Sequence, residues 1–556
     1  MIRRLGFLTA ALVVAVLLFV LTTLPPAPRQ VTGGDSAPDG RTIPGAFHIH
    51  TTRSDGAADK AAVARAAARA GLRFAVFTDH GDGTRPPDPP AYIDGVLCLD
   101  GVEISTNGGH YAALGMRPAP YPLGGEPRAV VEDVARLGGF GVVAHPGSLR
   151  AELAWRDWPL PFDAVEWLNA DSEWRDERRV TLARTILQYL MRPAAALSAL
   201  LDRPSATLAR WDAEAARRRV LAFAAHDAHG GIGGRPAEGQ SGRTLHVPSY
   251  ESSFRVFSVR AILDRPFTGD APADAVSLME ALRAGHAFTA IDALAQGGTL
   301  NFQARASREM PMQGDLLTAD GPATYTAKAA VPEGASIVLL MNGEPVAERP
   351  GGTIEFESSR EGAFRVEVRL PGAPGSPPVP WLLSNPIFRH PARPPDVEMP
   401  VDVDDPAPTL ALSGSRIEKD PGSIGEVIAS PGGAGMRYEL RGGARASQFV
   451  ALVADLPADL PQYEGLAFTA SAASSSRVSV QLRFAKDGDQ RWGRSIYVDR
   501  EPQAMIVREQ DLVPAERTGS RPDLRRATSL LFVVDLTNAN PGTGGEVYVS
   551  DLRLLR

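Results

Sequence analysis

Short apolar runs recur through the first half of the chain, and most of them end at a histidine, an aspartate or a glutamate. They cover residues 74–77, 96–99, 141–144 and 221–224. Because they are apolar on both sides, they predict buried strands of a largely parallel sheet. The stretches 57–70 and 126–137 have the composition or apolar spacing of helices, and a glycine follows each one. This alternation predicts an α/β barrel, in which functional side chains gather at the carboxyl ends of the strands.

From about residue 297 the pattern changes to short strand-like runs separated by Asn-Gly, Pro-Gly and Gly-Gly turns. Such spacing predicts a β-sandwich over 297–390. The Pro- and Asp-rich stretch 391–408 is typical of a linker. A second all-β domain is expected over 409–556, and its strand pattern resembles the jelly-roll of carbohydrate-binding modules. Trp492 in that domain is a candidate for stacking on a sugar ring, with core packing as the alternative.

The amino terminus combines a basic cap, Met1-Ile2-Arg3-Arg4, with a nearly unbroken apolar run over 5–24. About 20 apolar residues suffice to span a bilayer as a helix, and the basic cap would stay cytoplasmic. We therefore expect a transmembrane signal anchor over 1–28 and a linker over 29–44, with a cleaved signal peptide as the alternative. Either reading places the body of the protein outside the cytoplasmic membrane, in the periplasm or at the cell surface.

Composition narrows the possible functions. The chain has 556 residues, 44% of them hydrophobic, which is enough for several domain cores. The formal net charge is −7 and no basic patch with interleaved aromatic residues occurs, so a nucleic-acid surface is not indicated. The single cysteine, Cys98, excludes an intramolecular disulfide. All but one of the 10 histidines lie between His48 and His286, so any histidine chemistry belongs to the first half of the chain.

Two histidines one residue apart, His48 and His50, point to the same side of an extended segment and can both bind one metal ion. Further imidazole and carboxylate groups follow the apolar runs or lie between them: Asp55, His80, Glu103, His110, His145, Asp227 and His229. Such mixed nitrogen and oxygen ligands suit Zn, Mn or Fe(II). A carboxylate such as Glu103 can bridge two cations, and paired cations activate water for ester hydrolysis. The pattern therefore predicts a hydrolytic centre with several metals.

These motifs resemble the PHP (polymerase and histidinol phosphatase) superfamily. They run in order as H-x-H-T with S-D-G, T-D-H, G-x-E, G-G-H, A-H-P and D-x-H within residues 45–296. The resemblance implies a distorted (β/α)7 barrel that holds two or three divalent metals. It assigns one metal to His48, His50, Glu103 and Asp227, a second to Glu103, His110 and His145, and a third to Asp55, His80 and His229. Residues 282–288 and 384–387 are similar to the carbaryl-hydrolase-like branch.

The expected reaction is hydrolysis of a small phosphate ester. Glu103 and Asp227 are expected to act through the metals, and either a metal or His229 would take up the charge of the leaving group. Candidates for gripping the substrate are Arg53, Arg243, His246 and His286, each with an ordinary surface role as the alternative. One rival function is hydrolysis of a carboxyl or carbamate ester on the same metals. Another is a non-catalytic envelope protein that binds glycan.

Four further residues stay open at the level of sequence. Asp79 either orients His80 as a hydrogen-bond acceptor or caps the following loop. Glu166 and Asn169 lie where another strand ends, and they either face the metals or have a structural role. His226, next to Asp227, is expected to point the other way and pack.

Overall fold

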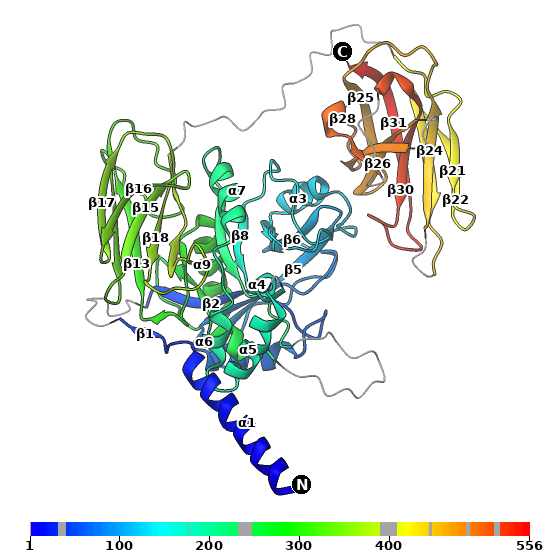
Figure 1. Ribbon diagram of the computed structural model, residues 1–556. Helices are drawn as coiled ribbons and strands as arrows, with labels where there is room; N and C mark the ends of the chain where they lie inside the picture. Colours follow the sequence, from blue (N-terminus) through cyan, green and yellow to red (C-terminus); the bar gives the residue numbers. More distant parts are fainter. Residues whose placement is uncertain are drawn as a thin grey trace. The chain divides into compact units, whose positions relative to one another are not determined.

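The computed structural model describes residues 2–31, 40–175, 177–231, 247–389, 409–443, 447–484, 490–515 and 523–555. Contacts divide the chain into two compact units. The first takes residues 1–81, 87–117 and 134–393, and the second takes residues 82–86, 118–133 and 394–556. Figure 1 shows the elements of both units coloured along the sequence.

A curved sheet in the first unit carries the predicted strands. Its consecutive neighbours are β2 (Thr42–Ile49), β3 (Phe74–Phe77), β5 (Val96–Thr106), β6 (Gly109–Leu114), β7 (Phe140–Ala144), β8 (Ala164–Asn169) and β9 (Leu221–Ala225). The sheet curls back on itself, because the backbone N–H of His226 after β9 donates to the carbonyl of Phe47 in β2. The predicted α/β barrel is thus present as a closed mixed sheet.

The sheet is less parallel than the sequence predicts. The pairs β2–β3, β3–β5, β7–β8 and β8–β9 are parallel, but β6 runs antiparallel to both β5 and β7. β10 (Ser258–Ile262) and β11 (Ala287–Ala290) are antiparallel as well. The reversal at β6 follows from a tight turn before Gly109, whose φ of 117° is a conformation that favours glycine.

Helices connect these strands. α2 (Lys60–Arg69) begins where the Asp59 side chain accepts the N–H of Ala62, and it buries four side chains that include Val63. α3 (Pro127–Arg136) occupies the second predicted helical stretch. Four helices lie between β8 and β9: α4 (Ala170–Arg175), α5 (Arg179–Tyr189), α6 (Pro193–Ser198) and α7 (Ser205–Ala215). α8 (Tyr250–Phe254) and α9 (Ala271–Ala284) complete the unit.

The amino terminus forms a helix, α1 (Ile2–Thr23), but the expected membrane anchor is not supported. Among the described residues no helix is both long enough and apolar enough to cross a membrane. After α1, the short strand β1 (Arg29–Gln30) pairs with β12 (Ala295–Gln296), so part of the expected linker is structured.

The strands after residue 297 form two sheets within the first unit. β13 (Thr299–Arg305), β14 (Ala323–Ala330) and β17 (Thr353–Ser358) make one of them. The others extend the barrel sheet, because β19 (Leu382–Ser384) pairs with β11 and leads to β18 (Gly362–Arg369), β15 (Ser336–Met341) and β16 (Glu344–Pro350). A buried Arg365 donates two hydrogen bonds to Asp212 of α7 and one to Glu367, which ties this region to the barrel helices.

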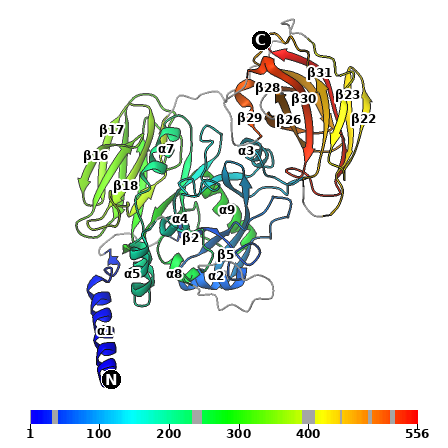
Figure 2. The same cartoon turned by 45° about the vertical axis from the view of Figure 1, so that its right-hand side comes forward.

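The second unit contains a sandwich of two antiparallel sheets, seen from another side in Figure 2. One holds β21 (Arg416–Lys419), β24 (Phe449–Asp455), β30 (Ala527–Asp535), β26 (Ser476–Phe484), β27 (Gln490–Val498) and β29 (Val513–Pro514). The other holds β22 (Ile424–Ser430), β23 (Gly433–Glu439), β31 (Gly544–Leu555), β25 (Gly465–Ala472) and β28 (Gln503–Arg508). Trp492 is buried in the shared core, so it packs there and is not exposed for stacking on a sugar. The predicted linker over 391–408 lies outside the described residues.

Candidate metal centre

His48, near the end of β2, and His50, just past that end, lie close together, as the sequence predicts. Nε2 of His48 lies 3.0 Å from Nε2 of His50, and both side chains are fully buried. His50 is held just beyond the strand because its N–H donates to the carbonyl of Ala228 at the end of β9. The closure of the barrel therefore fixes both imidazoles at one point.

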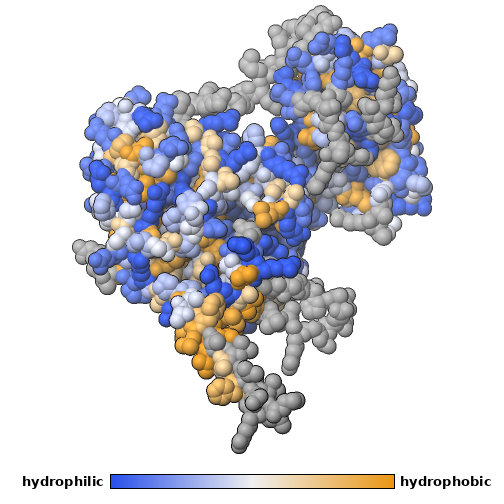
Figure 3. Space-filling view, viewed as in Figure 1, coloured by the Kyte–Doolittle hydropathy of each residue, from blue (hydrophilic) through white to orange (hydrophobic). Residues whose placement is uncertain are grey.

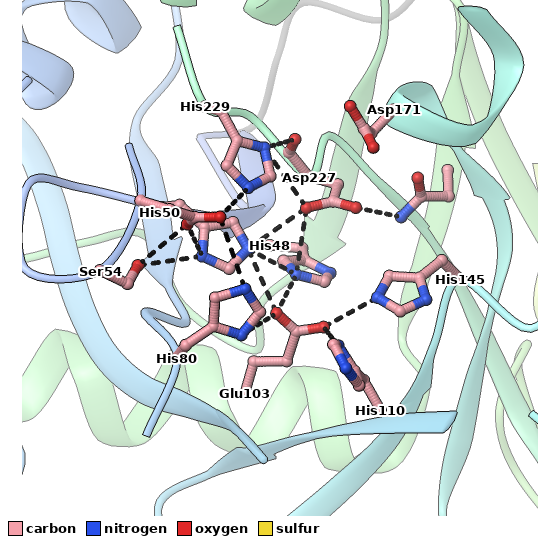
Figure 4. Close-up of polar contacts among 12 residues, drawn as sticks. His48, His50, Ser54, His80, Glu103, His110, His145, Asp171, Asp227 and His229 are labelled. Carbon is pink, nitrogen blue, oxygen red and sulfur yellow. Dashed lines mark hydrogen bonds and ion pairs between the residues drawn. The ribbon is translucent and has the colours of Figure 1, made fainter. Parts of the chain in front are cut away.

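Glu103 lies at the middle of the cluster, and its two oxygens face different imidazoles (Figure 4). Oε2 lies 3.3 Å from Nε2 of His48, 3.3 Å from Nε2 of His50 and 3.1 Å from Nδ1 of His80. Oε1 lies 2.9 Å from Nδ1 of His110 and 2.8 Å from Nε2 of His145. A carboxylate with one oxygen toward each set of ligands has the arrangement that a bridging ligand needs.

The register of β5, β6 and β7 explains this convergence. His110 on β6 pairs with Ser105 of β5 on one side and with Ala144 of β7 on the other. His145 follows Ala144 directly. Because Glu103 lies two residues before Ser105, alternation places its side chain on the same face of the sheet as that of His110. His145 lies just past the end of β7, where its positive φ departs from the alternation of the strand. On the other side, a bridge between His80 and Glu103 aligns the loop after β3 with β5.

Two aspartates and one histidine complete the cluster. Oδ1 of Asp227 lies 3.2 Å from Nε2 of His50 and 3.5 Å from Nε2 of His48. Asp55 faces His50 at 3.5 Å, His229 at 3.3 Å and His80 at 3.7 Å. All nine residues predicted as ligands are therefore brought together. Three overlapping groups have ligand atoms close enough to hold an ion: His50, Asp55, His80 and His229; His48, His50 and Glu103; and His80, Glu103 and His110.

Charge in this cluster favours a bound cation. Burial alone would lower the pKa of His50, but the carboxylates of Asp227 and Glu103 raise it to about 10. Burial would likewise raise the pKa of Glu103, yet the surrounding imidazoles hold it well below its usual range. Buried carboxylates without a positive partner are costly, so the cluster requires positive charge, which either protonated imidazoles or a bound cation can supply. With mixed imidazole and carboxylate donors, divalent Mn, Zn or Fe fits that requirement.

Three of the clustered residues have a backbone conformation that only glycine adopts readily. The φ values are 63° at His48, 29° at His145 and 45° at Asp227. Positive φ in residues with a Cβ is uncommon and gathers at functional sites, where the surroundings must hold it in place. Histidine and aspartate adopt positive φ more often than most residues with a Cβ, but this weak preference does not single out these positions in the sequence.

Outer contacts orient the ligands. Oε1 of Glu166 lies 2.5 Å from Nδ1 of His48, and Oε2 accepts the backbone N–H of His145 at 2.7 Å. The Asn169 amide donates to Oε2 of Glu166 at 2.8 Å and to Oδ2 of Asp227 at 3.3 Å. Glu166 and Asn169 therefore face the cluster. Such contacts fix ring orientation and typically matter for metal affinity.

The remaining open residues now have clear contacts. Asp79 accepts hydrogen bonds from the N–H of Thr51 and the hydroxyl of Ser54, each at 2.7 Å, so it fixes the loop after His50. The expected packing role of His226 is confirmed, because its ring stacks on Phe257 with centroids 4.3 Å apart. Burial lowers the pKa of His226 to about 4, which keeps the ring neutral.

Two of the four residues predicted to grip the substrate, Arg53 and His286, have acidic partners of their own. The Arg53 guanidinium donates to Asp88 at 2.7 Å and to Asp100 at 3.1 Å. Nε2 of His286 lies 2.8 Å from Oδ1 of Asp315. These partners lie far from Arg53 and His286 in the sequence, so the sequence does not indicate them. Arg243 and His246 lie outside the described residues.

Comparisons with known proteins give partial likenesses. No family model matches the chain, and no curated protein matches it. Among solved structures, a two-domain protein of Bacteroides vulgatus that contains a predicted PHP-like metal-dependent phosphoesterase is 12% identical, with a TM-score of 0.28 over 65% of this chain and 99% of that one. A candidate metal-dependent phosphoesterase of Bifidobacterium adolescentis is 14% identical, with a TM-score of 0.24 over 40% of this chain and 93% of that one.

A third solved structure is similar to another part of the chain. A family 11 carbohydrate-binding module of Clostridium thermocellum is 18% identical, with a TM-score of 0.21 over 27% of this chain and 94% of that one. None of these comparisons supports the narrower resemblance to the carbaryl-hydrolase-like branch. The chemistry that follows therefore rests on the geometry of the cluster.

Proposed function

We propose that the protein is a PHP-type phosphoesterase that uses two or three divalent metals. The observation that carries this proposal is the position of Glu103, whose two oxygens face separate sets of imidazoles. Divalent ions there would supply an activated water and positive charge for the phosphate oxygens. Glu103 would bridge the ions, and Asp227 and Asp55 would neutralise part of their charge.

The substrate would approach from the side of Asp55, His80 and His229. Their side chains are 48%, 35% and 22% exposed, whereas those of His48, His50 and Glu103 are buried. Nδ1 of His229 donates to the carbonyl of Asp227 at 2.8 Å, which leaves Nε2 turned toward Asp55 and the open side. His229 would therefore either bind an ion through Nε2 or hold a proton for the leaving oxygen.

Hydrolysis of a carboxyl or carbamate ester on the same centre is the second candidate, since a paired-metal site polarises such esters too. The alternative of glycan binding without catalysis has no support from Trp492, because that side chain is buried in the core of the second unit. A small ester remains the proposed partner. The location outside the cytoplasmic membrane stays a prediction from the amino-terminal sequence.

A panel of chromogenic esters tests the proposal. The full-length protein would be stripped with a chelator, reloaded separately with Mn, Zn and Fe(II), and assayed on phosphate monoesters, phosphate diesters, carboxyl esters and carbamates. Phosphate release that is lost on chelation, restored on reloading and absent in Glu103→Gln is the expected result. Turnover of carboxyl esters or carbamates alone would favour the second candidate. No turnover of any ester by the reloaded protein would contradict both.

A further inference from the structure

An apolar cavity of about 120 Å³ lies between α4, α5, α6 and the segment that contains α8. Its lining includes Leu182, Ile186, Leu197, Leu201 and Val256. A cavity lined by hydrocarbon side chains favours an apolar ligand over a sugar or a nucleotide, whose polar groups would lose their water without gaining partners.

The polar groups of the lining mostly have partners already. The Glu173 carboxylate accepts the N–H of Asp202 at 2.7 Å, and the Tyr189 hydroxyl lies 2.6 Å from the hydroxyl of Ser252. The exception is Thr185, whose buried hydroxyl has no hydrogen-bond partner among the described residues. A ligand in this cavity would therefore meet hydrocarbon almost everywhere and one free hydroxyl.

The same elements that wall the cavity also hold the metal ligands. Ala170 lines the cavity, and it directly follows Asn169, whose amide lies 3.3 Å from Asp227. On α8, the Tyr250 hydroxyl donates to the carbonyl of His50 at 2.7 Å, while Ser253 one turn later lines the cavity. Two elements, the β8–α4 junction and α8, are therefore shared by the cavity wall and by the residues that contact the metal ligands.

The outer wall of the cavity is an exposed apolar surface. Ile186 lines the cavity and is also 51% exposed. On the same helix and just after it, large apolar side chains face the solvent: Val180, Leu187, Leu190 and Met191. α1 adjoins them, since the Gln188 amide donates to the carbonyl of Thr23, and Leu17 and Leu21 are exposed there. Figure 3 shows this apolar surface below the barrel. An apolar entrance that leads to an apolar cavity suits a hydrocarbon chain.

From these contacts we infer that the cavity binds the aliphatic chain of an amphiphilic phosphate ester whose phosphate lies at the metal centre. The inference rests on the proposed function for the phosphate and on the cavity for the chain. Each methylene transferred from water to such a site strengthens binding roughly fourfold. The substrate class is thus a lipid-like phosphate and not a polar metabolite.

Chain-length dependence tests this assignment. kcat/KM of the full-length, metal-loaded protein would be measured with ethyl, butyl, hexyl and octyl phosphate, all below their micelle-forming concentrations. We expect kcat/KM to rise roughly fourfold per methylene until the cavity is filled. Ile186→Trp, which narrows the cavity, should flatten the rise, whereas Leu190→Trp, on the same helix but outside the lining, should keep it.

Binding of the fluorescent fatty acid cis-parinaric acid to the metal-free protein gives a readout without catalysis. Binding by the wild type and by Leu190→Trp, with at least a tenfold loss in Ile186→Trp, would support an aliphatic site. If that pattern appeared but no phosphate were released from any ester, the aliphatic site would stand and the proposed function would fail. Hydrolysis of ethyl and octyl phosphate with equal kcat/KM would overturn the inference and leave the proposed function intact.

Discussion

Oε1 of Glu166 on β8 lies 2.5 Å from Nδ1 of His48 on β2. The other oxygen of the same carboxylate accepts the N–H of His145. Because His48 and His145 both have positive φ, these two contacts hold strained residues in the conformation that directs their Nε2 atoms inward. Glu166 is thus the residue that orients one side of the cluster.

Replacing Glu166 tests this role. Glu166→Gln should lower metal affinity by about 10- to 100-fold, because the amide has no charge and keeps only one acceptor oxygen for the contacts with His48 and His145. The fold should persist, since the amide keeps the shape of the side chain. Titration of the metal-free protein with Mn or Zn would measure the change. Glu344→Gln, at an exposed glutamate, is the control, and equal affinities of the two variants would exclude the orienting role.

Asp55 and Glu103 should differ in how many ions they support. Of the clustered imidazoles, the Asp55 oxygens face those of His50, His80 and His229, whereas Glu103 faces both sides of the cluster. Asp55→Asn should therefore remove one ion per chain and leave the buried part of the site loaded. Glu103→Gln should deplete the whole centre. Elemental analysis after gel filtration distinguishes the two variants, and an equal loss would show that the groups are not separable.

Low pH should destabilise the region after residue 297, where Glu367 on β18 pairs with two arginines. Burial alone would raise the pKa of Glu367, but Arg365 and Arg203 lower it from 4.5 to about 2. The folded state thus binds this proton less tightly than the unfolded state. The ionised Glu367 carboxylate contributes about 3 kcal/mol to the free energy of unfolding. This contribution is complete above pH 4.5 and is lost as the pH falls toward 2.

Urea unfolding of the metal-free protein between those pH values would measure the effect. Glu367→Gln should be less stable than the wild type at neutral pH, and the difference between the two should shrink as the pH falls. The carboxylates of the metal centre are common to both proteins, so their titration cancels. A difference that stays constant with pH would contradict the assigned pKa.

The loop after His50 leaves no room for a methyl group at Gly56. A Cβ there would lie 2.4 Å from the carbonyl oxygen of His50 and 2.7 Å from the backbone nitrogen of Thr51. Gly56→Ala should therefore displace the His50 backbone, destabilise the protein by about 1–3 kcal/mol and weaken metal binding. Gly442→Ala is the control, because the described residues leave open space around it. Thermal unfolding and metal titration of both variants provide the measurement.

Much of the centre could be predicted because its ligands follow buried strands, and the carboxyl ends of such strands meet in a barrel. His48, His50 and His145 are found by this reasoning. The antiparallel direction of β6, which the sequence does not predict, leaves its ligand in place, since His110 still pairs with Ala144 of β7.

Other features depend on contacts between distant residues and left no local signal. The pairing of Thr289 with Leu383 carries the barrel sheet past residue 297, where turn-rich sequence had indicated a separate sandwich. The pairing of Arg53 with Asp88 and Asp100 likewise joins residues that are far apart in the sequence. The amino-terminal apolar run predicted a helix correctly, but the step from a helix to a membrane anchor was not supported.

The central claim is that this cluster is a metal centre with a bridging glutamate. Elemental analysis of the full-length protein, purified and then reloaded with Mn, Zn or Fe(II), tests it most directly. The account predicts two or three ions per chain, with loss of most of them in Glu103→Gln. Binding of no metal by the reloaded wild-type protein, or unchanged metal content in Glu103→Gln, would contradict it.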